Sequence, residues 1–244
     1  MKRRKLNTNK VIGILFFFLL LTLGTCFFLK SDFFYLKKVV ISNNKYLSKD
    51  EIRNLISIEI NKNIFFYDLN KLEDKVKSST YVEDCKIKRK LPDKLIVNIK
   101  EKKIIGPLYN DKIYCYMDDK GKFVDEIKNI KNNETVIYLD YNLNKKTINF
   151  KSKDDKNKLI TLCKKLDEEN ILTQMRSIDF KKKSVINMKG KSGITICLNK
   201  NNNIGKNVRR LKKVLVDLKN RKELYGKVDL TYNNYILYSP YYRE

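Results

Sequence analysis

Two pairs of adjacent carboxylates come closest to a catalytic arrangement: Asp118 with Asp119, and Asp154 with Asp155. As a general acid and a general base, two carboxyl groups would have to reach one substrate together. Neighbouring residues in a strand point to opposite faces, however, and aspartates in turns commonly accept hydrogen bonds from nearby backbone amides. We therefore predict that both pairs are structural.

Several other catalytic groups are missing from the sequence. It contains no histidine, which excludes imidazole metal ligands and Ser-His or Cys-His nucleophiles. It contains only eight glycines and no glycine-rich loop that would cradle a phosphate. We predict a binding protein rather than an enzyme, with no catalytic residue, no cofactor, no metal and no small-molecule substrate.

The cysteines leave two interpretations open. Cys26 lies within an apolar run, whereas Cys85, Cys115, Cys163 and Cys197 are widely spaced and form no Cys-x-x-Cys pair of the kind that binds metal. Four cysteines in an exported domain could form disulfides. Each also has apolar neighbours, among which a free cysteine behaves as a small hydrophobic residue. We favour four buried thiols.

The positive charge of the chain also has two readings. A formal net charge of +25 over 244 residues would suit a nucleic acid or an anionic surface. The lysines, however, occur in every segment together with many Asn and Ile residues, which is typical of a genome-wide composition bias. We predict no nucleic-acid partner. The 42% of hydrophobic residues is enough for the cores of one or two small domains.

One segment indicates the location of the protein. Residues 11–29, VIGILFFFLLLTLGTCFFL, are uncharged, and a helix of this length rises about 28 Å, close to the thickness of a bilayer's hydrocarbon core. The preceding tail, residues 1–10, is rich in basic residues: Lys2, Arg3, Arg4, Lys5 and Lys10. This density of positive charge predicts a cytoplasmic N-terminus and an exported body.

Two alternatives to a retained anchor fit this segment less well. A cleaved signal peptide has a shorter apolar core and small residues before the cleavage site, but Gly24 and Thr25 still lie inside the apolar run. A lipoprotein would carry its lipid on Cys26, but Thr25 is a poor residue at the position before a lipidated cysteine. We predict an uncleaved, single-pass transmembrane helix.

Residues 33–102 predict a small β-α-α-β-β domain. A strand at Val39–Ser42 comes first, and Ser48 with Glu51 forms a capping box at the start of a helix. Asp68 caps a second helix. Two strands follow, joined at a Pro-Asp corner. Their inward positions carry alternating apolar residues: Val82, Cys85, Ile87, Leu95, Val97 and Ile99. Two helices covering one face of a short sheet give an α+β unit.

Residues 103–244 predict a larger, curved, mostly β domain with two flanking helices. Gly121 allows the turn of a first hairpin. Helical periodicity marks one helix at Leu159, Leu162, Cys163 and Leu166, and a second one at Val208, Leu211, Leu215 and Leu218. Between them, Ile194, Ile196 and Leu198 alternate as in a strand. The alternation of strands and helices predicts a sheet with its helices on one side.

The chain ends in a tyrosine-rich stretch, VDLTYNNYILYSPYY, with Tyr232, Tyr235, Tyr238, Tyr241 and Tyr242. We predict an edge strand here. The unpaired amides and carbonyls of such a strand can be completed by a partner's strand, and tyrosines add contact area at a low entropic cost. The alternative is that these tyrosines only complete the core.

Taken in order, these segments resemble the FtsQ/DivIB family of bitopic cell-division proteins. Residues 33–102 are similar to the family's POTRA domain, and FFYLKKVVISNNKYLSKDEI and NIFFYDLNKLEDKV contribute to that likeness. The family signature R-x-x-P-x-x-L-x-I-x-I-x-E fits Arg89, Pro92, Leu95, Val97, Ile99 and Glu101. One departure is Ile104, where the family often has a proline. The fold class implied is α+β, with a transmembrane helix, a POTRA-type domain and a mostly β domain.

The resemblance implies a divisome scaffold in the cell membrane at the division septum, with extracytoplasmic domains. It implies that FtsB/DivIC-like and FtsL-like coiled-coil proteins are recruited and that septal peptidoglycan synthesis is thereby regulated. The positions it assigns to partner binding are Val228, Asp229, Leu230, Tyr232, Tyr235, Ile236, Leu237 and Tyr238. An alternative function is that of an anchored POTRA protein that helps to fold or deliver exported polypeptides.

Overall fold

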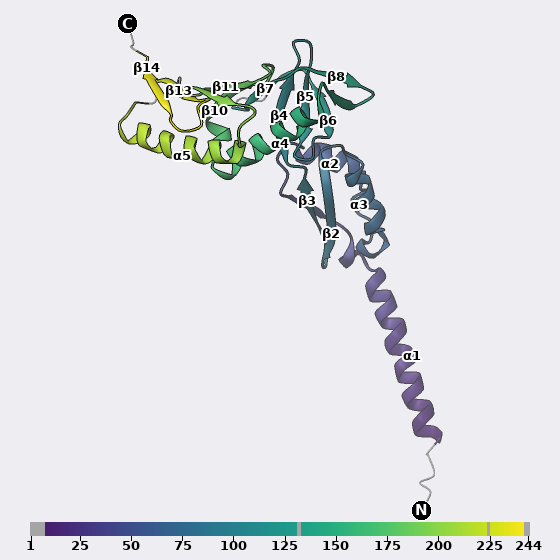
Figure 1. Cartoon of the computed structure of the whole chain (residues 1–244). Helices are drawn as coiled ribbons and strands as arrows, with labels where there is room; N and C mark the ends of the chain where they lie inside the picture. Colours follow the sequence, from purple (N-terminus) through teal and green to yellow (C-terminus); the bar gives the residue numbers. More distant parts are fainter. Residues whose placement is uncertain (1–7, 131–132, 224, 242–244) are drawn as a thin grey trace, which may run out of the picture. The chain divides into compact units, whose positions relative to one another are not determined.

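The computed structural model describes residues 8–130, 133–223 and 225–241. The basic residues before Thr8 and the last predicted tyrosine, Tyr242, lie outside these ranges. The chain divides into two compact units, Met1–Glu101 and Lys102–Glu244. Each unit has a hydrophobic core of its own, so each is described separately (Figure 1).

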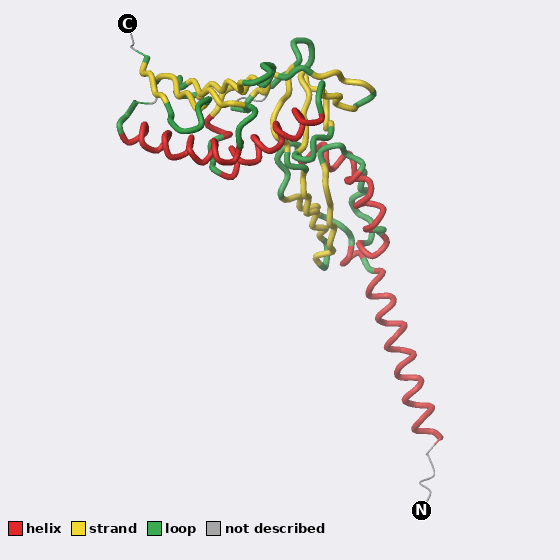
Figure 2. Tube along the Cα trace, viewed as in Figure 1, coloured by secondary structure: helices red, strands yellow, loops and turns green. Residues whose placement is uncertain are grey.

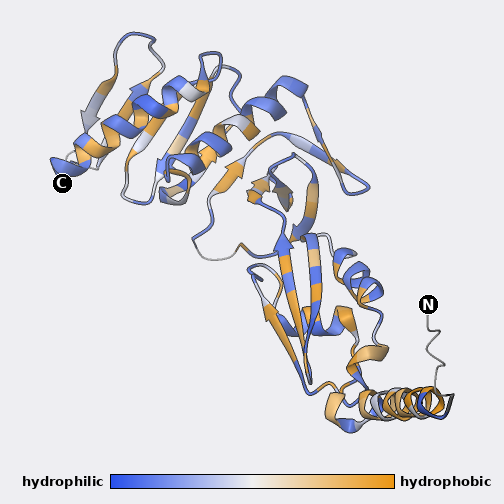
Figure 3. Cartoon of the chain, turned by 90° about the horizontal axis from the view of Figure 1, so that it is seen from below, coloured by the Kyte–Doolittle hydropathy of each residue, from blue (hydrophilic) through white to orange (hydrophobic). Residues whose placement is uncertain are grey.

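The first unit begins with a long helix, α1 (Thr8–Lys30). Its 23 residues correspond to about 35 Å of rise. Most of its residues are apolar and are coloured orange in Figure 3, and Leu15 and Phe17 are 64% and 63% exposed. By length and composition, Asn9–Lys30 can cross a membrane. Helix α1 thus has the properties of a transmembrane anchor.

The rest of the first unit is a three-stranded sheet with two helices. Its elements are β1 (Lys38–Ser42), α2 (Lys49–Ile56), α3 (Leu69–Lys77), β2 (Val82–Lys90) and β3 (Lys94–Glu101). The strand order is β1-β3-β2, with β1 parallel and β2 antiparallel to the central β3. This arrangement confirms the predicted β-α-α-β-β fold.

Local hydrogen bonds explain where the two helices begin. The backbone amide of Glu51 donates to Ser48 Oγ, and the Glu51 carboxylate accepts from the Ser48 amide at 2.7 Å, which completes the predicted capping box. Asp68 caps α3 by accepting from the amide of Lys71. Buried side chains of both helices pack with those of the strands in one core: Ile52, Ile56, Leu72, Val76, Cys85, Leu95 and Val97.

The second unit is built on a nine-stranded sheet in the order β14-β13-β12-β11-β10-β7-β4-β5-β6. The strands are β4 (Ile104–Tyr109), β5 (Tyr114–Asp118), β6 (Phe123–Ile127), β7 (Val136–Tyr138), β10 (Met175–Asp179), β11 (Val185–Gly190), β12 (Thr195–Asn199), β13 (Gly226–Leu230) and β14 (Leu237–Pro240). A separate hairpin consists of β8 (Tyr141–Asn144) and β9 (Thr147–Phe150).

Two helices cover one side of this sheet, as Figure 2 shows: α4 (Lys153–Glu168) and α5 (Ile204–Asn220). Their predicted apolar stripes are buried: Leu159, Leu162, Cys163 and Leu166 on α4, and Val208, Leu211, Leu215 and Leu218 on α5. Both stripes belong to the same core as the inward side chains of the strands. The prediction of a mostly β domain with two helices on one side is confirmed.

Candidate functional site

The first carboxylate pair, Asp118 with Asp119, lies at the turn of the hairpin formed by β5 and β6. Asp118 is only 2% exposed, and its Oδ1 accepts hydrogen bonds from the backbone amides of Lys120, at 3.0 Å, and Lys122, at 2.7 Å. Gly121 lies between these donors with a φ of +74°, a conformation that glycine adopts without strain. Asp118 therefore stabilises the turn between β5 and β6, as the sequence analysis predicts for it.

The second pair lies in the first turn of α4, and each of its two carboxylates forms an ion pair, Asp154 with Lys158 and Asp155 with Lys200. The Nζ of Lys200, a residue only 3% exposed, lies 2.6 Å from Asp155 Oδ1. The same Nζ lies 3.9 Å from the ring centroid of Phe180. This lysine connects α4 to the end of β12. Sequence reasoning missed it because nothing distinguishes it among 53 lysines and arginines.

The thiols have a structural character. Cys85, Cys115, Cys163 and Cys197 are all buried, and none forms a disulfide. Burial raises the pKa of the Cys163 thiol from 9.0 to about 12 and that of the Cys115 thiol to about 11. Because the thiolate is the reactive form, these cysteines are poor nucleophiles at neutral pH. The structure supports the buried-thiol interpretation over disulfides.

One spacing typical of catalytic serines lies in the first unit. Ser42 is followed three residues later by Lys45, which is the Ser-x-x-Lys pattern of some acyl enzymes. The Ser42 Oγ donates a 2.6 Å hydrogen bond to Asn98 Oδ1, from β1 to β3. The Nζ of Lys45 lies 5.3 Å from the ring centroid of Tyr46. The serine thus links two strands, and the lysine packs on an aromatic ring.

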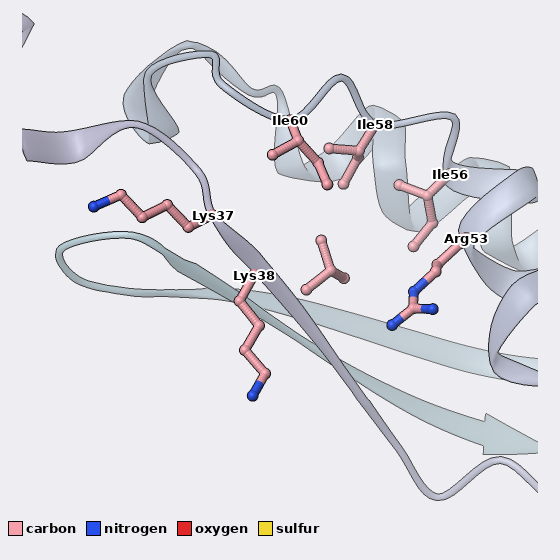
Figure 4. Close-up of a pocket in the computed structure, with 7 residues that line it drawn as sticks. Lys37, Lys38, Arg53, Ile56, Ile58 and Ile60 are labelled. Atoms are coloured by element: carbon pink, nitrogen blue, oxygen red, sulfur yellow. The ribbon is translucent and has the colours of Figure 1, made fainter. Parts of the chain in front are cut away.

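A cavity of about 290 Å³ lies beside β1 (Figure 4). Ile56, Ile58 and Ile60 form one wall, and Lys37 and Lys38 lie on the opposite side. None of the lining residues carries a carboxylate, a hydroxyl or a thiol. The cavity is an apolar hollow with basic residues around it.

The edge of the large sheet differs from the sequence prediction. The predicted edge residues Val228, Asp229 and Leu230 belong to β13, which pairs with β12 on one side and with β14 on the other. Val228 and Leu230 are 0% exposed, and Asp229 is half-buried. This part of the prediction is corrected, because the chain reverses after Leu230 and adds one more strand outside β13.

The edge strand is β14, and the remaining predicted residues lie in it or just before it. Tyr232, Tyr235 and Leu237 are 43%, 52% and 48% exposed. Ile236 and Tyr238 are partly buried against the core. This alternation leaves Tyr235 and Leu237 as exposed side chains at the edge.

An arginine that sequence reasoning missed holds the loop before β14. Arg210, on α5, donates hydrogen bonds to the backbone carbonyls of Tyr232, at 3.2 Å, and Tyr235, at 3.0 Å. The rings of these two tyrosines stack, with centroids 4.5 Å apart and planes at 20°. The guanidinium fork therefore positions a preformed pair of exposed tyrosine rings. Sequence alone does not distinguish Arg210 from the neighbouring Arg209.

Two further groups fix the strands at this edge. The hydroxyl of Tyr238 donates to the carbonyls of Glu223, at 2.6 Å, and Tyr225, at 3.2 Å. Burial acts against the charge of Asp229, but hydrogen bonds from the hydroxyl and amide of Thr231 hold the pKa of this carboxyl below its ordinary value. In the described part of the chain, no strand pairs with the outer side of β14. The arrangement can accept an added strand.

The signature positions of the first unit have structural roles. Leu95, Val97 and Ile99 are buried in its core. Arg89 donates to the carbonyls of Ile64 and Tyr67, and the Glu101 carboxylate accepts from the amides of Tyr46 and Leu47. Arg89 and Glu101 thus connect loops to the two ends of the β2–β3 hairpin.

Comparison with known proteins agrees with this reading of the first unit. The family described as "POTRA domain, FtsQ-type" matches residues 34–102. A "Cell division protein DivIB" of Clostridium tetani is 36% identical over 124 residues, which cover 51% of this chain and 45% of the relative.

Two further relatives named "Cell division protein DivIB" come from strains of Clostridium botulinum. Each is 28% identical, over 158 residues (63% of this chain and 60% of the relative) and over 182 residues (71% and 70%). The matches thus span less than two thirds of the length of the first two relatives. Together with the FtsQ-type POTRA domain and the apolar helix α1, these similarities support the resemblance of this chain to the FtsQ/DivIB family.

Proposed function

We propose that this protein is a membrane-anchored scaffold in cell division that holds its partners at the edge strand β14. Three features support the proposal: an apolar helix with the properties of an anchor, the names of the relatives, and a sheet edge with exposed Tyr235 and Leu237. The anchor would place the two folded units outside the cytoplasm, at the division septum, with the basic N-terminal tail inside.

The proposed partners are FtsB/DivIC-like and FtsL-like coiled-coil proteins, through which the scaffold would regulate septal peptidoglycan synthesis. The single observation that carries the binding mode is the unpaired outer side of β14 among the described residues. A partner strand would gain backbone hydrogen bonds there, and the stacked rings of Tyr232 and Tyr235 would supply a rigid apolar contact.

The proposal is tested with two matched substitutions. Leu237→Lys changes the edge, and Val216→Lys changes α5 on the same unit. Both native side chains are 48% exposed, so both variants should keep the native circular dichroism spectrum. We expect Leu237→Lys to weaken binding of the extracytoplasmic FtsB/DivIC-like segment about tenfold, or about 1.4 kcal/mol, and Val216→Lys to leave the affinity unchanged.

Isothermal titration with each purified variant measures this difference. Equal affinities of the two folded variants would rule out β14 as the contact. A pull-down with the whole protein separates the alternatives at the level of function. Recovery of the coiled-coil division proteins supports the scaffold, whereas recovery of unfolded exported polypeptides alone would indicate a role in folding or delivery.

A further inference from the structure

One end of the first unit carries apolar side chains that its core does not bury. Phe33 and Phe66 are 55% and 62% exposed, Phe65 is 38% exposed, and Leu91, at the tip of the β2–β3 hairpin, is 55% exposed. We call these four residues the apolar tip. They come from three separate stretches of the chain, so their gathering is a property of the fold and not of one apolar segment.

Direct contacts join the apolar tip to the end of α1. The side-chain amide of Asn63 donates a 2.8 Å hydrogen bond to the carbonyl of Leu29. The ring centroid of Phe34 lies 5.2 Å from that of Phe28 and 5.2 Å from that of Phe65. Aromatic pairs at such distances attract each other beyond the burial of their area. The turn Ile64–Phe66 is therefore packed onto the residues where the apolar helix ends.

The hairpin reaches the same end of the unit. The guanidinium of Arg89, near the end of β2, donates to the carbonyl of Ile64 at 2.9 Å, and the amide of Lys37 donates to the carbonyl of Asp93 at 2.9 Å. Figures 1 and 3 both show the tip of the hairpin beside the end of α1. Leu91 and the phenylalanine turn thus lie at the end of the unit from which α1 departs.

Exposed basic residues accompany the apolar tip. Lys30, Lys37, Lys62 and Lys90 are exposed within four positions of the tip residues, and the acidic residues within the same distance are Asp32, Asp68 and Asp93. Aromatic rings and lysines together are the composition that suits the interface between lipid headgroups and acyl chains. Lysine side chains beside an anionic leaflet are attracted to its headgroups.

We propose that the apolar tip is a membrane-docking surface. Its side chains enter the headgroup region of the bilayer that α1 spans, and the four lysines contact anionic phospholipid headgroups. The occupant is lipid because the tip is continuous with a helix whose apolar surface requires it. The POTRA domain is then held against the bilayer in one orientation. This inference rests on the anchor of the proposed function and is independent of β14.

The natural absence of tryptophan gives a direct test. Three single-tryptophan variants of the full chain, Phe17→Trp, Phe66→Trp and Tyr81→Trp, are placed in vesicles of brominated phosphatidylcholine and phosphatidylglycerol. Phe17 lies within α1 and reports the anchor. Tyr81 precedes β2, at the opposite end of the hairpin, roughly 30 Å from its tip along the strand, and serves as the control within the same unit.

We expect strong quenching at position 17, strong quenching with a blue-shifted emission at position 66, and several-fold weaker quenching at position 81. Omitting phosphatidylglycerol should weaken the quenching at position 66 only. Quenching at position 17 with none at position 66, or equal quenching at positions 66 and 81, would overturn the docking surface while leaving the anchor intact. An absence of quenching at position 17 would overturn both.

Discussion

Strand β3 of the POTRA domain and strand β14 of the second unit each carry a leucine, but the surroundings of the two strands differ. Strand β3 pairs with β1 and β2, and Leu95 is 0% exposed. Strand β14 pairs with β13, and Leu237 is 48% exposed. The strand with the recognisable signature is thus buried between two others, whereas the strand proposed to bind a partner is an edge whose outer side is unpaired among the described residues.

Two arginines extend the comparison. Arg89 donates to carbonyls of the segment before α3, and Arg210 donates to carbonyls of the loop before β14. Both organise a loop from a neighbouring element. The first belongs to the family signature, whereas the second was found only in the structure. Hydrogen bonds from an arginine to backbone carbonyls therefore stabilise the fold of the first unit and the candidate binding surface of the second.

The largest expected effect compares the two leucines. Leu95→Ala should lower the free energy of unfolding of the POTRA domain by about 3 kcal/mol, because it leaves a cavity in a closed core. Leu237→Ala should change the stability of the second unit by less than about 0.5 kcal/mol. Urea denaturation of both variants measures the difference. A similar loss in both would show that β14 belongs to the core and is not an available edge.

The next effect compares the two arginines. Arg89→Ala should cost about 2 kcal/mol of stability, because charge-assisted hydrogen bonds to backbone carbonyls are lost. Arg210→Ala should cost about 1 kcal/mol and should also weaken partner binding, because the tyrosine pair loses its support. Urea denaturation measures the change in stability, and isothermal titration with the partner segment measures the change in affinity. Unchanged partner affinity with native stability in Arg210→Ala would remove the positioning role of this residue.

The last comparison concerns pH. Burial raises the pKa of Cys85 in the first unit to about 11, and that of Cys163 in the second unit to about 12, each from 9.0. Above pH 9 the unfolded thiols ionise first, so the unfolded state binds fewer protons and stability falls until the pH reaches the raised values. Because the second unit contains two further buried thiols, Cys115 and Cys197, it should lose more stability than the first.

Urea denaturation at neutral pH and at about pH 10 measures how much the free energy of unfolding of each unit falls with pH. Cys163→Val is the control, since it removes one raised pKa and keeps an apolar side chain in the core. If the second unit of Cys163→Val loses as much stability between these pH values as the native unit does, groups other than Cys163 cause the loss.

Much of the fold followed from local patterns. The apolar run predicted α1, Ser48 and Asp68 predicted the starts of α2 and α3, and periodicity predicted the buried faces of α4 and α5. These features depend on residues within a few positions of one another. The edge was misplaced because the chain reverses between β13 and β14, and because β13 also pairs with β12, which precedes α5 in the sequence.

Within the candidate site, the sequence pointed to the tyrosines and to Leu237 but included the buried Val228 and Leu230. An alternating strand pattern gives the same signal in an edge strand and in the strand next to it. Lys200 and Arg210 were missed because their partners, Asp155 and the carbonyls before β14, lie far away in the sequence. In a chain with so many basic residues, no local pattern marks these two.

By itself, the sequence determined the apolar helix, the order of elements in the POTRA domain, the signature hairpin and the absence of histidine chemistry. These depend on composition and on short-range periodicity, which the backbone translates directly into helices and strands. Only the tertiary structure decided which strand is the edge, which lysine is buried and which phenylalanines remain uncovered. Those properties depend on long-range strand pairing and packing, which bring together residues that no local pattern connects.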